Sequence, residues 1–550
     1  MLREEIENLI ERAIHKKAFV ERPDDFNYGD FSTNVAIKEK IDPQEIADKL
    51  KESPLFEKVE VVNGFINFFL KPEHFLENLS QVLKQKEEYG SSNVGKGKTI
   101  VIDYSGPNIA KSFGIGHLRS TIIGQAIYNL YKFLGYKCIG DNHLGDWGTQ
   151  FGKLIFQIEL KIKNEKLKIH ELTIDDLERL YVEFHKEAEQ NPVLNDEARA
   201  WFKKLEDGDK KAKEIWQACK EISLKEFARI YSLLGVKIDN TLGESFYVDK
   251  MQPIFEEMKD KDLTKQSEGA WVVEFPNNEL SSLVLMKSDG ATTYYLRDLA
   301  TIKYRLKKWK PNIIVYEVGV DQSLYFKQLF KTVDLLGWAK DVRFEHIVHG
   351  LMRSKTGKFS TRKGDTIHLE DVLKEAINKA KELSGEKNKE LAKQVGIGAV
   401  KYNDLSQHHS RDIVFDWDKI LNLKGNSGPY LQYTFARTQS VLEKAGGSPT
   451  SVKINKVDFE VLEEIEKILL KKLSHFNEAI EQAAITFSPN LICNYVFDLA
   501  QSFNLFYNEI QILKADTELQ KQFRLALTFG VGQVIKNSLT ILGIESPNKM

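Results

Sequence analysis

The stretch that decides the fold is KTIVIDYSGPNIAKSFGIGHLRSTIIGQAIYNLYKFLG, residues Lys98–Gly135. It begins with an apolar run over Thr99–Tyr104, which predicts a buried strand, and it ends with apolar residues at helical spacing from Leu118 to Leu134. Between them lies a turn-rich loop that closes with GIGH, Gly114–His117. A strand, a glycine-containing loop and a helix in this order direct backbone N–H groups and the positive end of a helix dipole into the loop. The ligand expected in this loop is a phosphate group. We call residues 105–119, the loop together with the first residues of the helix, the first loop.

The first loop also carries side chains that suit chemistry on a nucleotide. His117 can donate a hydrogen bond, and Lys111 and Arg119 are cations. A glycine loop alone is weak evidence. Glycine together with His, Lys and Arg at a strand-to-helix turn predicts a site for a nucleotide polyphosphate.

The composition is that of a globular protein, with 550 residues, of which 42% are hydrophobic and 29% charged. The apolar runs are too short to span a bilayer, and the N-terminal segment lacks the architecture of a signal peptide, so we expect a cytoplasmic protein without a membrane partner. The three cysteines form no CxxC pair, which predicts no structural zinc. The formal net charge of −2 places any nucleic-acid contact in local patches.

The order of patterns along the chain predicts an α/β fold with several domains. A Rossmann-like parallel-sheet catalytic domain is expected at 98–365, with a helical insertion at about 160–265. A small N-terminal α+β domain is expected at 1–90, a stem-contact linker at 366–395 and a C-terminal α-helical bundle at 396–550. The strands expected in the sheet are Thr99–Tyr104, Lys137–Asp141, Asn312–Val318 and His346–Met352, and the helices expected in the bundle include Lys467–Ala484, Asn490–Ile512 and Gln520–Leu542.

A second phosphate-binding loop is predicted at Gly350–Leu369, GLMRSKTGKFSTRKGDTIHL, after another apolar strand. We call it the second loop. The hydroxyls of Ser360 and Thr361 suit phosphate oxygens, and the cations of the loop are Arg353, Lys355, Lys358, Arg362 and Lys363. A solvated basic loop is the alternative interpretation. The glycine content favours mobility, and mobile cations that close on a polyphosphate stabilise the charge that develops in nucleotidyl transfer.

Two short motifs occur in the order found in class I aminoacyl-tRNA synthetases. Gly114–His117 resembles HxGH, and Lys358–Arg362, KFSTR, resembles KMSKS. The longer segments narrow the resemblance to arginyl-tRNA synthetases over essentially the whole chain; they are SGPNIAKSFGIGHLRSTIIG, NHLGDWGTQFG, SDGATTYYLRDLA, KFSTRKG and GNSGPYLQYTFAR. Gly114 replaces the first His of HxGH, and Thr361 replaces the second Lys of KMSKS. Lys111 stands where the family has a lysine that takes this role.

The resemblance implies an arginine–tRNA ligase. Such an enzyme activates L-arginine with ATP, accompanied by Mg²⁺, and transfers arginine from arginyl-adenylate to the 3′-terminal adenosine of tRNA-Arg. Its partners would be tRNA-Arg, L-arginine and ATP, and a monomer is expected. A catalytically impaired synthetase-like tRNA-binding protein is the alternative that Gly114 leaves open.

The resemblance also implies roles for individual residues. Lys111, His117 and Lys358 would be catalytic. ATP would be bound by Gly114, Gly116, His117, Gly319, His349, Gly350, Lys358, Ser360 and Arg362. L-Arginine would be bound by Asp103, Ser105, Asn108, Tyr294, Asp298 and Gln322, with the guanidinium between the two carboxylates, which match its N–H donors best. Without the resemblance, Asp298 could equally complement the N-terminus of a helix, and Asp103 could be an ordinary strand-end carboxylate.

The parts expected to face RNA are the two ends of the chain. The family's N-terminal domain contacts the tRNA elbow, and GDFSTN at Gly29–Asn34 is the matching motif, although it could equally be a turn that builds the fold. Most aromatic residues of the bundle have helical spacing and are expected in its core. A few exposed ones could stack on anticodon bases, and the sequence leaves open which.

Overall fold

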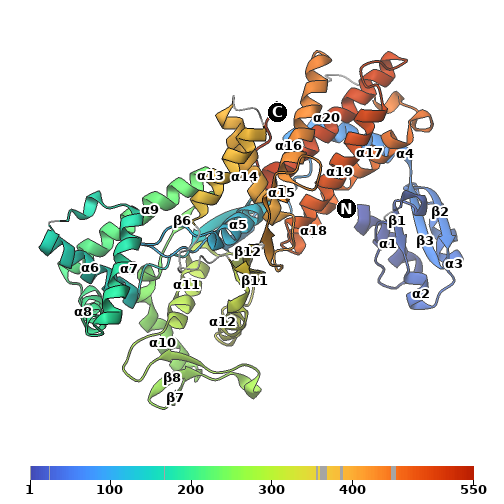
Figure 1. Ribbon diagram of the computed structural model, residues 1–550. Coiled ribbons are helices and arrows are strands. Elements are labelled where there is room, and N and C mark those ends of the chain that lie inside the picture. Colours follow the sequence, from blue (N-terminus) through green and yellow to red (C-terminus); the bar gives the residue numbers. More distant parts are fainter. Residues whose placement is uncertain are drawn as a thin grey trace.

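A five-stranded parallel sheet in the order β11-β10-β4-β5-β6 lies at the centre of the computed structural model, which describes residues 2–23, 25–165, 167–354, 357–358, 368–383, 388–447 and 454–550 (Figure 1). The strands are β4 (Thr99–Asp103), β5 (Lys137–Asn142), β6 (Asn240–Thr241), β10 (Ile313–Gly319) and β11 (Arg343–His349). The two strands at the middle of the sheet, β4 and β10, are largely apolar runs because a parallel sheet is covered on both faces. The predicted Rossmann-like sheet is therefore confirmed.

One predicted strand is displaced. The pattern placed a strand at His346–Met352, but β11 ends at His349 and a new strand, β12 (Met352–Ser354), begins after Gly350. A β-carbon built on Gly350 would lie 2.6 Å from the backbone carbonyl carbon of Arg411. The chain turns here against another segment, and no local pattern reports such a long-range approach.

Helix α5 (Gly116–Phe133) begins at the end of the first loop, as predicted, and is buried on most of its surface. It packs on β4, β5 and β10 of the sheet and also on α14, α18 and α20 of the C-terminal part. The apolar residues of α5 are therefore buried both against the central sheet and against the C-terminal helices.

Helices occupy most of the range expected for the insertion, about 160–265, and the first of them begins before it, at Thr149. These helices are α6 (Thr149–Glu165), η3 (Ile169–Glu171), α7 (Ile174–Gln190), α8 (Leu194–Glu206) and α9 (Lys210–Leu234), followed by η4 (Glu244–Lys250) and α10 (Met251–Asp260). A small antiparallel sheet, which the sequence did not predict, follows. Its strands are β7 (Lys265–Ser267), β8 (Ala270–Val273) and β9 (Leu283–Met286), and η5 (Pro276–Asn278) lies between β8 and β9. The chain returns to the central sheet through α11 (Tyr294–Trp309), η6 (Val320–Gln322) and α12 (Ser323–Leu335).

The C-terminal part is a helical bundle, as predicted. Strands β13 (Gly357–Lys358) and β14 (Ile413–Phe415) flank β12, and the helices are α13 (Leu369–Leu383), α14 (Lys389–Leu405), α15 (Trp417–Ile420), α16 (Gly428–Lys444), η7 (Ile454–Lys456), η8 (Phe459–Val461), α17 (Glu464–Ser474), α18 (Phe476–Ile485), α19 (Asn490–Glu509) and α20 (Glu518–Ile541). The single helix expected at Lys467–Ala484 is two helices that meet at His475.

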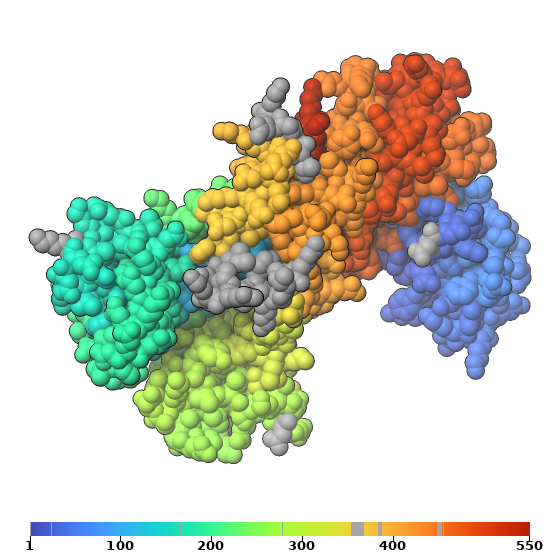
Figure 2. Space-filling model, in the orientation of Figure 1, coloured from blue at the N-terminus to red at the C-terminus, as the bar shows by residue number. Residues whose placement is uncertain are grey.

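The N-terminal domain contains an antiparallel sheet in the order β1-β3-β2. Its elements are α1 (Leu2–Ile14), η1 (Phe26–Tyr28), β1 (Phe31–Thr33), α2 (Val35–Glu39), α3 (Pro43–Leu50), β2 (Phe56–Val62), β3 (Phe65–Leu70), α4 (Pro72–Gln85) and η2 (Lys86–Glu88). Figure 2 shows this domain and the insertion at opposite ends of an elongated molecule.

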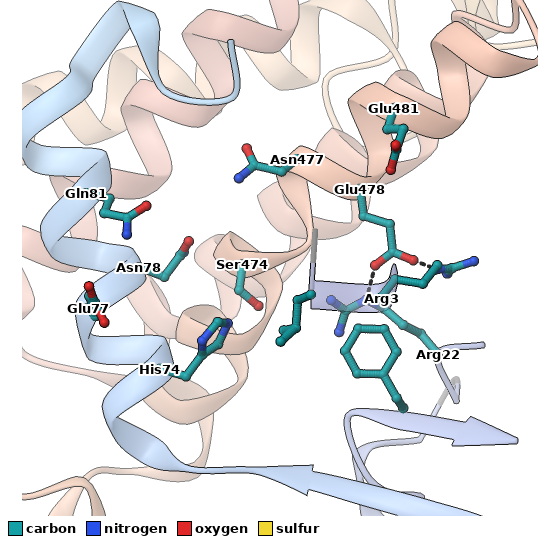
Figure 3. A pocket seen from close by; sticks show the side chains of 12 residues that line it. Arg3, Arg22, His74, Glu77, Asn78, Gln81, Ser474, Asn477, Glu478 and Glu481 are labelled. Atoms are coloured by element: carbon teal, nitrogen blue, oxygen red, sulfur yellow. Dashed lines mark hydrogen bonds and ion pairs between the residues drawn. The ribbon is translucent and has the colours of Figure 1, made fainter. Parts of the chain in front are cut away.

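Charged side chains dock the N-terminal domain on the bundle. Arg3 and Arg22 converge on Glu478 of α18, at the edge of a cavity of about 290 Å³ that α4 closes from the other side (Figure 3). Asp30, within the GDFSTN motif, accepts a hydrogen bond from the Leu70 N–H at 2.8 Å and lies 2.9 Å from the Lys471 ammonium. This part of the motif therefore builds and docks the fold.

Candidate active site

A cavity of about 410 Å³ opens at the carboxyl ends of β4 and β10. The chain leaves β4 toward β5 on one side, whereas it leaves β10 toward β11 on the other, so the strand order reverses here. Loops that follow such strands diverge and leave a crevice, which is the usual ligand site of an open α/β sheet. The first turn of α5 also faces this cavity through Gly116 and His117.

The structure brings most of the predicted site residues together. Those that line the cavity are Asp103, Ser105, Asn108, Gly116, His117, Tyr294, Asp298, Gly319, Gln322 and His349. Lys111, Gly114 and Gly350 lie outside its lining. Ser360 and Arg362 fall outside the described residues, as does the side chain of Lys358.

Asp103 ends β4 and shares a buried cation with a second aspartate. Its Oδ2 lies 2.8 Å from the guanidinium of Arg305, which has no exposed side-chain surface and also lies 2.7 Å from Asp141. Arg305 is therefore shared between two carboxylates. Because Asp103 lines the cavity, a ligand there meets a carboxylate whose orientation Arg305 fixes.

Asp298 is the second carboxylate of the cavity, and it has a different environment. The Tyr325 hydroxyl donates a hydrogen bond to its Oδ2, and His143 Nε2 lies 3.7 Å from its Oδ1. Burial raises the pKa of Asp298, because the charged carboxylate loses hydration. Thr293 is the N-cap of α11, so Asp298 lies too far into the helix to cap it. A cationic ligand here would compensate for the lost hydration.

Aromatic rings cover this part of the cavity. Tyr294 lies one helical turn before Asp298 and is 57% exposed, and its ring centroid is 5.3 Å from that of Tyr325. Phe326 and Tyr316 complete the apolar wall. Ring faces beside a carboxylate favour a planar cation, because the ring quadrupole attracts positive charge.

Glu244, His143 and Glu317 line the cavity and were missed as site residues. Glu244, at the start of η4, lies 3.3 Å from the guanidinium of Arg297, and burial raises the pKa of Glu244. His143 follows β5, and neither of its ring nitrogens has a hydrogen-bond partner among the described residues. The position of His143 after a predicted strand was the available signal. Glu244 stood in no motif that indicated a site.

The pKa values of His117 and His349, the two histidines of the predicted ATP site, are shifted in opposite directions. Burial lowers the pKa of His117, and Lys111 and His349 lower it further, so the imidazole is neutral near pH 7. Burial opposes a charge on His349 as well, but Glu317 at 3.0 Å from its Nδ1 raises the pKa of His349. His117 is therefore a hydrogen-bonding group, and His349 belongs to a charge pair.

Lys111 lies on the insertion side of the first loop. Its Nζ is 5.3 Å from the ring centroid of Tyr181 on α7, which is a cation–π distance. Ser112, the next residue, donates its backbone N–H to Glu178 at 3.4 Å and its hydroxyl to Asp175 at 3.3 Å. The insertion therefore holds the segment that carries Lys111.

The backbone of the first loop is strained and held from several sides. Ser105 and Ala110 have φ values of 78° and 62°; a non-glycine residue in this left-handed region costs roughly 1–3 kcal/mol. Ile109 donates its N–H to the carbonyl of Gly145 at 3.2 Å, and Ala110 donates to the Ser223 hydroxyl at 2.8 Å. These bonds fix the loop shape at the cavity edge.

Three family models match consecutive parts of the chain. The model described as tRNA synthetases class I (R), catalytic domain, matches residues 78–417. The arginyl tRNA synthetase N-terminal domain matches residues 1–70, and the DALR anticodon binding domain matches residues 431–550.

Curated relatives and solved structures agree with these models. Arginine–tRNA ligase of Clostridioides difficile is 42% identical, with 100% of this chain and 98% of the relative covered, and that of Clostridium botulinum (strain Loch Maree) is 45% identical, with 92% and 91% covered. The arginyl-tRNA synthetase structure from Plasmodium falciparum has a TM-score of 0.85 at 24% identity, covering 100% of this chain and 99% of that one. The Thermus thermophilus arginyl-tRNA synthetase structure has a TM-score of 0.84 at 23% identity, with 100% of both chains covered. Because both structures are less than 25% identical to this chain, these two comparisons show a shared fold only. The chain belongs to the class I arginyl-tRNA synthetase family.

Proposed function

We propose that this protein is an arginine–tRNA ligase that consumes ATP. The observation that carries the proposal is the cavity at the switch point of the sheet, in which Asp103 and Asp298 face the same space as the first turn of α5. One end of the cavity thus suits a guanidinium, and the other suits phosphate oxygens. Membership in the arginyl-tRNA synthetase family supports the same assignment.

The arginine end recognises its ligand by charge and shape. Asp298 accepts from the guanidinium on one side, and Asp103, oriented by Arg305, accepts on the other. Tyr294 covers the planar group at the mouth. Asn108, on the first loop, and Gln322, at the end of η6, bind the polar end of the amino acid. A lysine would present one nitrogen instead of a planar fork and would satisfy fewer of these acceptors.

The phosphate end orients and screens two anionic reactants. The carboxylate oxygen of arginine bonds to the α-phosphorus of ATP, and the bond from that phosphorus to the bridging oxygen breaks, so pyrophosphate leaves. Neutral His117 and the N–H groups of α5 hold phosphate oxygens, while Lys111 and Lys358 neutralise the leaving group. Lys111 has to leave Tyr181 to do so. In the second step the terminal adenosine hydroxyl attacks the carbonyl carbon, and AMP leaves.

Mg²⁺ would enter this site on the ATP phosphates. No group of three or more His, Cys, Asp or Glu side chains suited to a metal ion exists in the described part of the chain. We expect phosphate oxygens and water to hold the cation, as Mg²⁺ prefers. When bound, Mg²⁺ supplies charge neutralisation.

The C-terminal bundle offers a stacking surface for RNA bases. Tyr433 and Tyr507 are 40% and 37% exposed. The Arg437 guanidinium lies over both rings, at 4.9 and 4.6 Å from their centroids, and it donates to Asn504 at 2.6 Å. A rigid Arg–Tyr stack suits unpaired bases of an anticodon loop. We therefore assign tRNA-Arg binding to this patch.

The remaining assignments follow the predicted division of the chain. We propose that 1–90 contacts the tRNA elbow, that 98–365 is catalytic with the insertion at 160–265, that 366–395 contacts the stem and that 396–550 binds the anticodon. We also propose a monomer in the cytoplasm. No described helix has the length and apolar character needed to cross a membrane.

The test is aminoacylation of tRNA-Arg with ATP and each of the twenty amino acids in turn. Arginine alone should be attached at a rate that depends on enzyme concentration. Preferential attachment of lysine or cysteine would overturn the pocket assignment. A complete lack of charging by folded protein would favour the impaired tRNA-binding alternative, which no feature of the cavity supports.

A further inference from the structure

Arg119 connects the first loop to distant parts of the chain. It follows His117 by two residues on α5 and is 1% exposed. Its Nε lies 3.1 Å from each carboxylate oxygen of Asp404, the penultimate residue of α14. Its terminal nitrogens donate to three backbone carbonyls: those of Gly350 at 2.8 Å, Arg411 at 2.7 Å and His409 at 3.1 Å.

The entry to the second loop is built on the same segment, residues 404–412, which we call the strap. Gly350 donates its N–H to the carbonyl of His409 at 3.0 Å. Asp412 accepts from the Leu351 N–H at 2.7 Å and from Arg353 Nε at 2.6 Å. Strand β12 then pairs in parallel with β14, directly after the strap. The second loop therefore starts from the strap as well as from the central sheet.

The exit of the second loop is attached to the first loop. Gly114 and His368 form an antiparallel bridge, and Leu369 donates its N–H to the carbonyl of Phe113 at 2.7 Å. The first loop and α5 thus hold both ends of the second loop, and Arg119 is the side chain that holds the entry.

We propose that Arg119 is a positioning residue that sets the spacing of the two phosphate loops and, through Asp404, ties both loops to α14. The inference rests on the proposed function, because the two loops must act on one ATP. Helix α14 packs on α16, which in turn packs on α19 and α20 of the C-terminal bundle. A displacement of the bundle therefore reaches the phosphate site through the Arg119–Asp404 joint.

Only an arginine can make this joint. The planar guanidinium carries donors on three nitrogens and reaches four acceptor groups at once, namely the Asp404 carboxylate and three backbone carbonyls. A lysine ammonium carries all its donors on one nitrogen. Arg119→Lys would keep a cation beside Asp404 and release backbone carbonyls of the strap. The expected consequence is a shift of the second loop against the first, with the fold retained.

The experiment measures arginine-dependent ATP–pyrophosphate exchange by the full-length protein with saturating tRNA-Arg. Because a misplacement of about 1 Å costs on the order of 10²-fold in rate, Arg119→Lys should lower kcat about 100-fold. KM for arginine should stay within about twofold, since the pocket carboxylates are untouched. Asp404→Asn keeps an acceptor for Nε and should lower kcat by about tenfold; it serves as the second variant if Arg119→Lys does not fold.

The matched control is Arg524→Lys in the bundle. Arg524 Nε lies 2.7 Å from Glu466, with side-chain exposures of 8% and 0%, so this pair is buried like the joint but touches neither loop. It should lower Tm while kcat per folded enzyme stays within about twofold of wild type. A folded Arg119→Lys variant with wild-type kcat, or losses that track Tm equally in both variants, would overturn the inference. A failure of the proposed function would instead appear in the wild type, as an absence of arginine-dependent exchange.

Discussion

Asp298→Asn tests the proposal that the cavity recognises a guanidinium through its carboxylates. Asp103 already shares Arg305 with Asp141, whereas the neighbours of Asp298 are the Tyr325 hydroxyl and His143. Asparagine keeps the size of the side chain and an acceptor for Tyr325, so the substitution removes the charge and little else. We expect arginine binding to weaken more in Asp298→Asn than in Asp103→Asn.

The size of the expected rise in the KM for arginine follows from the burial of Asp298. Removing one partner of a buried charge pair costs about 3–5 kcal/mol. The side chain of Asp298 is 27% exposed, so the lower end applies, and about 3 kcal/mol corresponds to roughly a 10²-fold rise in the KM for arginine. Asp103→Asn leaves Arg305 buried with Asp141 as its remaining carboxylate. That variant should lose thermal stability, with a rise of about tenfold in the KM for arginine.

The assay is the initial rate of aminoacylation against arginine concentration, with the KM for ATP as the internal control, expected to change less than about twofold. An unchanged KM for arginine in Asp298→Asn, or a larger rise in Asp103→Asn, would refute the reasoning.

The same carboxylate predicts a pH dependence. Burial raises the pKa of Asp298 in the free protein, so Asp298 takes up a proton at a pH where an ordinary aspartate is still ionised. Protonated Asp298 cannot pair with a guanidinium, and the KM for arginine should therefore rise as the pH falls through this raised pKa. Asp298→Asn should lose this component of the pH profile.

Three further predictions concern other parts of the molecule. Lys111→Ala should lower kcat by about 10²–10³-fold with little change in KM, because the charge acts on the leaving group. Tyr181→Leu should lower kcat by less. If kcat in Lys111→Ala stays within about twofold of wild type, neutralisation of the leaving group must be assigned to cations of the second loop instead. Tyr433→Ala should raise the KM for tRNA-Arg about 10–100-fold, as expected for a stacked base worth about 1–3 kcal/mol, and should leave ATP–pyrophosphate exchange at saturating tRNA unchanged; a wild-type KM for tRNA-Arg would exclude the Tyr433–Arg437–Tyr507 patch as its contact. Truncation after Lys424 should give a fragment that aggregates and binds no ATP analogue, because α5 packs on α18 and α20 and Tyr131 donates to the carbonyl of Ala484 at 2.9 Å; a soluble, ATP-binding fragment would show that the catalytic part folds alone.

The sequence predicted the elements that have a strong local pattern. The apolar run of β4 and the helical spacing of α5 placed the first loop correctly, and the change to helical periodicity after the sheet predicted the bundle. Most of the residues that the family resemblance assigned to the site line one cavity, which lies at the carboxyl ends of two neighbouring parallel strands.

Charge pairs between distant segments could not be predicted, because they leave no periodicity in the sequence. Arg305 pairs with Asp103 across 202 positions, and Arg119 pairs with Asp404 across 285. Each arginine sits in a helix whose pattern indicates only a buried face. The partners became visible once the sheet and the bundle placed the helices against each other.

The glycine that departs from the HxGH pattern has a backbone role. Gly114 pairs with His368 through the main chain, next to the bond from Leu369 to Phe113. The position that carries an imidazole in the class motif here anchors the exit of the second loop. Since a backbone contact of this kind needs no side chain at residue 114, the change to glycine leaves the attachment between the two loops in place. In the proposed site, we expect His117 and the N–H groups of α5 to be the neutral donors to phosphate, and we expect Lys111 and the second loop to supply the positive charge.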